Sequence, residues 1–237
     1  MKDILIIKTG RTVGSVPPQR GDFEHWIMAG MALPHSRFQT VEVCAEETLP
    51  VADNIAGMII TGSPAMVTDG LPWSERTATY LRDAIEKDMP VLGICYGHQL
   101  LAHALGGRVD FHLDGREMGT TEIRLAPEAL NDPLFAGIPA CFPVHVSHSQ
   151  SVVKLPENSL VLAANAFEAH HAVRFRERVW GLQFHPEFDA DIMRAYIHER
   201  RQALMAEGMD VPQLLADVED TPGASQVLRN FSRLIAD

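Results

Sequence analysis

Short apolar runs alternate with amphipathic segments along the first hundred residues. Four apolar runs have the length of buried strands, at residues 4–7, 38–43, 56–62 and 90–94. Between the last two, residues 73–88 carry Leu81, Ala84 and Ile85 at helical spacing, with charged residues on the opposite side. Because alternating strands and helices form βαβ units, the pattern predicts an α/β fold with a mostly parallel, twisted sheet and helices on both faces.

The pattern of apolar and polar residues changes after residue 108. Five short strand-like runs with turn residues between them follow, at residues 119–126, 141–149, 159–166, 169–175 and 178–185. They predict a small antiparallel β portion added to the sheet. Residues 189–208 then have helical character, and a last helix is expected near 222–235. With no linker or composition break, we expect one domain over 1–237, with a catalytic core to about 190 and a helical tail beyond it.

Composition and charge exclude some classes of function. Hydrophobic residues make up 46% and charged residues 22% of the 237 positions, which is ordinary for a globular protein. The net charge of −11 argues against binding to nucleic acid or an anionic membrane, since both require clustered Lys and Arg. No secretory signal or membrane-length apolar run is seen. Three widely separated cysteines fit a reducing compartment, so a cytoplasmic location is expected.

One of these cysteines stands where an apolar strand turns abruptly into a helix. In "PVLGICYGHQLL", Gly93 and Gly97 flank Cys95 at equal spacing. This pattern is typical of a nucleophile elbow, in which small residues let strand and helix approach closely around an exposed turn residue. The start of a helix also favours a thiolate. A buried cysteine with a packing role remains the alternative, and a base is needed to decide between them.

The segment "WGLQFHPEF" offers such a base. His185 follows an apolar run, and Glu187 lies two residues further on, so in extended chain both side chains point the same way. A carboxylate held against one ring nitrogen would orient the imidazole toward a thiol. A simple turn after a strand is the alternative interpretation.

The chain resembles class I (triad-type) glutamine amidotransferases in its motifs "GICYGHQ" and, further along, "FHPE". "IITGSPAMV" at 59–67 is similar to the loop that supplies an oxyanion-hole N–H in that family. "GREMG" at 115–119 and "SHSQSVVKLP" at 147–156 resemble the glutaminase domain of GMP synthetase more than other branches. The resemblance covers roughly residues 4 to 188. It implies a flavodoxin-like fold and a catalytic triad of Cys95, His185 and Glu187.

The resemblance also implies the remaining site residues. The backbone N–H groups of Tyr96 and Ser63 would form the oxyanion hole. The expected substrate contacts are Gln99, Gly62 and the segment of Ser147, His148 and Ser149.

Two positions depart from the family pattern. Ser63 stands where glycine is common, and if that position required positive φ the oxyanion hole would be unformed at rest. Met66 replaces a small polar residue and would reshape the substrate pocket.

The other candidate residues are expected to be structural. His98 belongs to the motif, but a packing role is favoured. His145, His170 and His171 lack metal-ligand spacing, and Cys44 and Cys141 have no motif around them. No metal or cofactor is therefore expected.

The predicted activity is cysteine-dependent hydrolysis of the glutamine side-chain amide through a γ-glutamyl thioester. No phosphate-binding loop or ATP-pyrophosphatase motif occurs, so a stand-alone glutaminase is expected, with a separate synthetase as a potential acceptor of ammonia. One alternative is a γ-glutamyl peptidase that uses the same thioester. A second is a regulatory or stress protein of the cysteine-elbow superfamily, although such proteins usually carry His where this chain has Tyr96.

Overall fold

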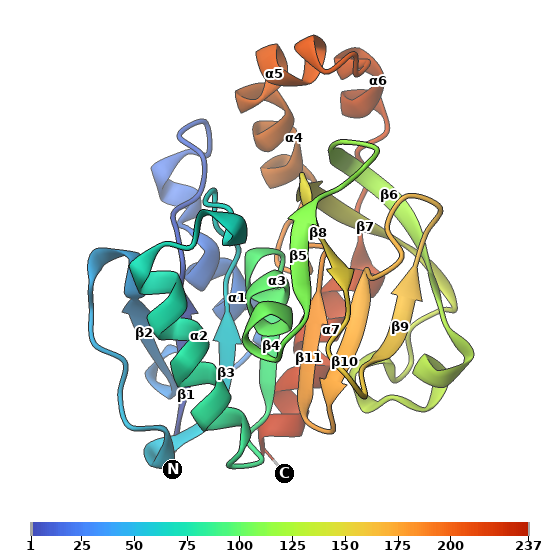
Figure 1. The fold of residues 1–237 in the computed structure, drawn as a ribbon. Coiled ribbons are helices and arrows are strands. Elements are labelled where there is room, and N and C mark those ends of the chain that lie inside the picture. Colours follow the sequence, from blue (N-terminus) through green and yellow to red (C-terminus); the bar gives the residue numbers. More distant parts are fainter. Residues whose placement is uncertain (1, 237) are drawn as a thin grey trace.

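The computed structural model describes residues 2–236, which build helices on both faces of one nine-stranded sheet (Figure 1). Its strands are β1 Asp3–Lys8, β2 Phe38–Glu42, β3 Ile55–Ile60, β4 Val91–Ile94, β6 Glu117–Leu125, β7 Cys141–His148, β9 Leu160–Ala164, β10 Ala172–Arg176 and β11 Val179–Leu182. Their order across the sheet is β2-β1-β3-β4-β11-β10-β9-β6-β7. A second sheet pairs β5 (Arg108–Phe111) with β8 (Gln150–Lys154).

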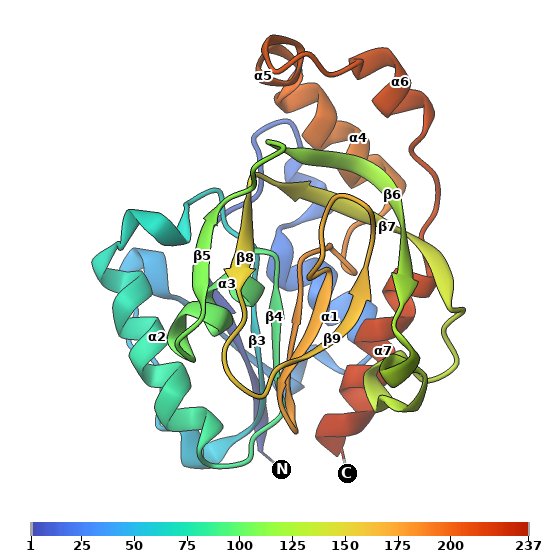
Figure 2. The ribbon, with the colours of Figure 1, turned by 45° about the vertical axis from the view of Figure 1, so that its right-hand side comes forward.

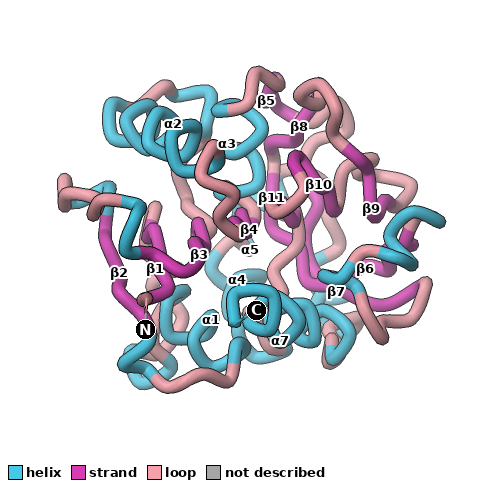
Figure 3. The backbone as a smooth tube through the Cα atoms, turned by 90° about the horizontal axis from the view of Figure 1, so that it is seen from below, coloured by secondary structure: helices cyan, strands magenta, loops and turns pink. Residues whose placement is uncertain are grey.

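The helices divide between the two faces of the sheet. They are α1 Phe23–Met31, α2 Pro72–Ile85, α3 Tyr96–Ala104, α4 Ala190–Glu199, α5 Arg201–Ala206, α6 Val211–Ala216 and α7 Pro222–Ala236. Figure 3 shows α2 and α3 on one side of the parallel strands, with α1 and α7 on the other. None of the helices between residues 2 and 236 combines the length and apolar character that crossing a lipid bilayer requires.

Strand β1 shows why its apolar run is continuous. Ile4 and Ile6 belong to the buried cluster that includes α1 and α7, whereas Leu5 and Ile7 belong to the cluster that includes α2 and α3. A parallel strand covered on both faces needs apolar side chains at every position rather than at alternate ones. The apolar runs of the first hundred residues therefore become the central strands of the sheet.

Parallel and antiparallel strands occupy different halves of the sheet. Strands β2, β1, β3, β4 and β11 are parallel neighbours. Strands β10, β9, β6 and β7 continue the same sheet in antiparallel pairing. The predicted fold class is confirmed, with one detail that the sequence did not reveal: most of the antiparallel strands extend the main sheet, and only β5 and β8 form a separate one.

The helical tail differs from its expectation in two ways. The helix predicted over residues 189–208 is interrupted at Arg200, which separates α4 from α5. Helix α6 was not predicted; it begins after Asp210, whose side chain accepts a hydrogen bond from the backbone N–H of Gln213. We call residues 190–216 the helical cap, because Figures 1 and 2 show α4, α5 and α6 beyond the carboxyl ends of the parallel strands.

Candidate active site

Cys95 occupies a sharp turn between β4 and α3. Its backbone has φ of 50° and ψ of −102°, a conformation that non-glycine residues rarely adopt. The flanking glycines make the turn sterically feasible: a Cβ on Gly93 would lie 2.4 Å from the carbonyl oxygen of Gly97, and a Cβ on Gly97 would lie 2.4 Å from that of Ile60. The strand-turn-helix geometry predicted from the sequence is therefore present.

The thiol of Cys95 faces a small cavity at the carboxyl edge of the sheet. Only 7% of the residue is exposed, and Sγ lies 3.9 Å from the carbonyl oxygen of Ser147. Cys95 and His185 line the same part of this cavity. The strand order explains their proximity, because β4, which leads to Cys95, is the parallel neighbour of β11, which leads to His185.

His185 is held firmly in one orientation. Its Nδ1 lies 2.8 Å from Oε1 of Glu187, and both side chains are buried. Its backbone N–H donates to the carbonyl of His145 at 2.8 Å, and its ring stacks on Phe188 with centroids 4.0 Å apart. Burial alone would lower the pKa of His185, but the negative charges of Glu187 and Cys95 raise it to about 10. His185 can therefore carry a proton at neutral pH beside the thiol.

The candidate oxyanion loop follows β3. The backbone φ of Ser63 is not positive. The condition under which this serine would leave the oxyanion hole unformed is therefore not met. Its Oγ donates to the carbonyl of Thr9 at 2.7 Å and accepts from the N–H of Ala65 at 3.1 Å. Gly62 packs tightly against the histidine, because a Cβ there would lie 3.0 Å from Cε1 of His185.

Tyr96 is the first residue of α3, where backbone N–H groups have no partner within the helix. The phenol oxygen of Tyr96 instead shares a hydrogen bond with Ser74 Oγ at 2.6 Å. Burial raises the pKa of Tyr96 to about 12, so the phenol stays protonated. The side chain of Tyr96 is therefore held by Ser74, and only its backbone N–H is a candidate oxyanion donor.

Four of the predicted substrate contacts line the cavity, as does Met66: Gln99, Ser147, His148 and Ser149. Gly62, the fifth, is not among the lining residues. Gln99 donates through Nε2 to the carbonyl of Gln150 at 2.8 Å and to Oε1 of Gln183 at 2.9 Å, which fixes its amide. The hydroxyls of Ser147 and Ser149 are buried without a hydrogen-bond partner among the described residues.

The imidazole of His148 is directed into the protein. It lies 2.9 Å from Oε2 of Glu117 and 3.0 Å from the carbonyl of Gln150. Although burial opposes it, hydrogen bonding to His148 and His171 holds the pKa of Glu117 well below its usual range. His148 therefore contributes to the cavity wall, while its side chain braces β6 against the neighbouring strand.

The remaining histidines pack or bond within the protein. His98 is fully buried, stacks on Phe175 and has its pKa lowered by burial. His145 bonds to Thr120 at 3.1 Å, and burial lowers its pKa to about 4. His170 bonds to the carbonyl of Val152 at 2.7 Å. Within residues 2–236, no group of three or more His, Cys, Asp or Glu side chains is arranged to hold a metal ion.

Sequence reasoning missed three arginines at the cavity. Arg116 lines the part that contains Gln99, Arg11 lines the part that contains His185, and Arg200 lines both. Arg116 lies within the quoted "GREMG", so that motif carried a signal. Arg200 comes from the interruption between α4 and α5, and the tail sequence contains no motif that marks it.

Comparisons with known proteins agree with this geometry. The family model described as Glutamine amidotransferase class-I matches residues 23–201. A GMP synthase (glutamine-hydrolyzing) from Aquifex aeolicus is 31% identical over 188 residues, which make up 76% of this chain and 35% of that protein. Another from Thermomicrobium roseum is 42% identical over 131 residues, which make up 55% of this chain and 23% of that protein. The chain thus spans between 23% and 35% of the length of these two relatives.

Solved structures share the whole fold. A glutamine amidotransferase from Thermotoga maritima superposes with a TM-score of 0.78 at 20% identity, covering 100% of this chain and 99% of that chain. One from Methylobacillus flagellatus gives a TM-score of 0.72 at 22% identity, covering 100% of this chain and 93% of that chain. The family resemblance inferred from the sequence motifs is confirmed. The chain belongs to the class I glutamine amidotransferase family and is an enzyme of that type.

Proposed function

We propose that this enzyme hydrolyses a γ-glutamyl amide, with the side-chain amide of glutamine as the first substrate, through a thioester on Cys95. The observation that carries the proposal is the strained cysteine turn facing a histidine whose Nδ1 lies 2.8 Å from a buried glutamate. A buried cysteine with a packing role alone would need neither the positive φ nor the charged partner.

The proposed reaction has two steps. Sγ of Cys95 attacks the γ-carbonyl carbon, and the C–N bond breaks as His185 gives its proton to the departing nitrogen. Water then attacks the thioester while His185 takes a proton, which releases glutamate and regenerates the thiol. Glu187 orients the imidazole and stabilises its charged form throughout.

Both steps pass through a tetrahedral oxyanion. The proposed donors are the backbone N–H groups of Tyr96, at the start of α3, and Ser63, after β3. One such donor is worth about 3 kcal/mol in the transition state. The groups proposed to hold the substrate are the Gln99 amide, fixed by its own hydrogen bonds, and the segment from Ser147 to Ser149. The Gly62 backbone is proposed to complete this wall.

The fate of the nitrogen defines the alternatives. Relatives of this chain are named as glutamine-hydrolysing GMP synthases, so a separate synthetase that receives ammonia is one proposed partner. Hydrolysis of a larger γ-glutamyl compound by the same thioester is the other. A regulatory protein without glutamine chemistry is disfavoured, because the three proposed triad residues occupy one site.

The proposal is tested by incubating the protein with glutamine, glutathione and a γ-glutamyl dipeptide, and measuring glutamate release. We expect turnover of at least one of them that disappears in Cys95→Ser. Equal turnover by the wild type and this variant would overturn the proposal.

A further inference from the structure

Cys95 lies where two small cavities meet. Gln99 and Gln150 are among the residues that line the first. His185, Phe23 and Arg11 are among those that line the second. Cys95, Ser147 and Arg200 line both of them. A substrate bonded at Cys95 therefore has one part on each side of the sulfur.

The chemistry assigns a part of the substrate to each cavity. His185 must reach the departing nitrogen to protonate it, so the leaving group lies in the cavity that contains His185. The glutamyl part then lies in the other cavity, beside the fixed amide of Gln99 and the unpartnered hydroxyls of Ser147 and Ser149. The leaving-group cavity contains two arginines as well as His185, although ammonia would need neither of them.

The three arginines near Cys95 differ in their ion pairing. Arg116 makes two bonds to Glu207, at 2.9 and 3.1 Å, and Arg11 makes two to Glu42, at 2.8 and 3.1 Å. Within the described part of the chain, Arg200 forms no salt bridge; its guanidinium lies 5.2 Å from the ring centre of Tyr196.

Arg200 is also partly withdrawn from water. Burial lowers the pKa of Arg200, and neighbouring Arg116 lowers it further. Glu199 and the Cys95 sulfur act on its charge only through longer-range attraction. A desolvated guanidinium without an acidic partner is well suited to bind a carboxylate, which it can grip with two parallel hydrogen bonds.

We propose that Arg200 binds a carboxylate on the leaving group, so that the preferred substrates are γ-glutamyl amino acids and peptides rather than glutamine. This inference rests on the proposed thioester function. The balanced reaction is the γ-glutamyl amino acid plus water giving glutamate plus the free amino acid. The amide C–N bond breaks, and the new amine takes its proton from His185.

Two substrates that differ only in the carboxylate test this inference. In γ-glutamylglycine the leaving group ends in a carboxylate, and in γ-glutamylglycinamide it ends in a neutral amide. We expect the wild type to favour the first in kcat/KM by about 10- to 100-fold, the range for a hydrogen bond to a charged group. Glutamine should be used less efficiently than γ-glutamylglycine.

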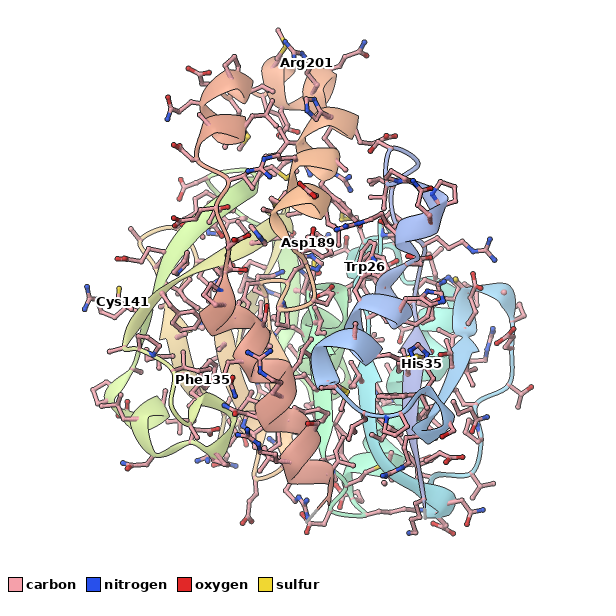
Figure 4. All side chains as sticks on the ribbon, turned by 180° about the vertical axis from the view of Figure 1, so that it is seen from behind. Trp26, His35, Phe135, Cys141, Asp189 and Arg201 are labelled. Atoms are coloured by element: carbon pink, nitrogen blue, oxygen red, sulfur yellow. The ribbon has the colours of Figure 1, made fainter. Side chains whose placement is uncertain are left out.

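Three variants assign this preference to a residue. In Arg200→Gln the ratio between the two substrates should fall toward one, and Arg200→Lys should restore part of it because the charge returns without the planar fork. The matched control is Arg201→Gln, the next residue, which is exposed and lies outside both cavities. Figure 4 shows Arg201 at the outer end of the helical cap, so this control should keep the full preference.

The possible failures can be told apart. If Cys95-dependent turnover occurs but the wild type uses both substrates equally, or Arg200→Gln slows both by the same factor, the inference about Arg200 is overturned and the thioester function stands. If neither compound nor glutamine is hydrolysed in a Cys95-dependent way, the proposed function itself is overturned, and the inference is overturned with it.

Discussion

Cys95 owes its position to a backbone conformation that side chains normally avoid. A non-glycine residue at φ of 50° and ψ of −102° stores about 1–3 kcal/mol of strain, which persists only where the surroundings enforce it. Here the enforcement comes from the hydrogen bond that the Cys95 N–H donates to Leu182 at 2.7 Å and from the close contacts around Gly93 and Gly97. In this conformation Cys95 lines the same cavity as His185 while it stays packed against the apolar core.

Cys95→Ser tests this residue directly. Because the exchange is nearly isosteric but removes the nucleophilic thiolate, we expect hydrolysis to fall by about 10⁴-fold or more while the fold is kept. Initial rates measure the first effect, and circular dichroism with thermal unfolding measures the second. Cys44→Ser is the control, since Cys44 is a partly buried cysteine that lines neither part of the cavity. An active Cys95→Ser variant would contradict the assignment.

Glu187→Gln should change the pH dependence as well as the rate. The Glu187 charge is a main reason that the pKa of His185 rises from 6.5 to about 10. Since His185 must be protonated to release the leaving amine, wild-type kcat/KM should decline only as the pH rises through about 10. Removing the carboxylate lowers the pKa of His185, so the alkaline limb of kcat/KM should move to lower pH. An unmoved limb with a lower plateau would mean that Glu187 contributes only to geometry.

At the level of residues, the sequence was informative where a local signature exists. The spacing of His185 and Glu187 predicted a shared direction, and their side chains do meet. The prediction for Ser63 depended on a positive φ, and the structure shows that this condition is not met; a residue name does not reveal the φ that the loop imposes. Arg200 could not be found, since its proximity to Cys95 depends on how α4 packs over the sheet.

Among elements, the junction of β4 and α3 depends most strongly on glycine. The hypothetical Cβ atoms of Gly93 and Gly97 collide with backbone rather than with movable side chains, so the strain cannot be relieved by a rotamer change. The same crossing brings α3 against β3, which carries the candidate oxyanion loop. The elbow and the oxyanion loop therefore depend on one contact.

Gly97→Ala should consequently be destabilising by about 2 kcal/mol or more, with loss of activity exceeding the loss of folded protein. Urea unfolding measures the free energy, and rates normalised to folded protein measure the rest. Gly14→Ala provides the control, because a Cβ at Gly14 meets nothing within 4 Å and that residue does not have positive φ. Equal stability of the two variants would show that the close approach is not constraining.

The elements that hydrophobic patterning predicted are those with a continuous local signal. The central strands were located from continuous apolar runs, because they are buried along almost their whole length, and α2 from its helical period, because one of its faces is buried and the other exposed. The signals for α6, with Asp210 before Pro212, were present but short. The placement of β11 beside β4 depends on contacts between distant segments, and periodicity does not encode those contacts.

For the whole molecule, sheet order explains how motifs some ninety residues apart meet. Strands β3, β4 and β11 are consecutive parallel neighbours, and the candidate oxyanion loop, Cys95 and His185 each follow one of them. In open α/β sheets, binding sites form at the carboxyl ends of such strands. The helical cap then covers this edge and supplies Arg200 (Figure 2). That residues 1–237 form one domain stays a prediction.

Covalent capture of the nucleophile tests the central claim most directly. Cys44 should be unreactive because burial raises the pKa of its thiol, and Cys141 because a hydrogen bond to Glu122 raises the pKa of its thiol. The intact protein is treated at neutral pH with a chloroketone analogue of glutamine, with and without excess glutamine or γ-glutamylglycine, and mapped by peptide mass spectrometry. We predict one modified site, Cys95, with loss of turnover and protection by at least one of the two compounds. Modification of Cys44 or Cys141 with Cys95 untouched would contradict the account.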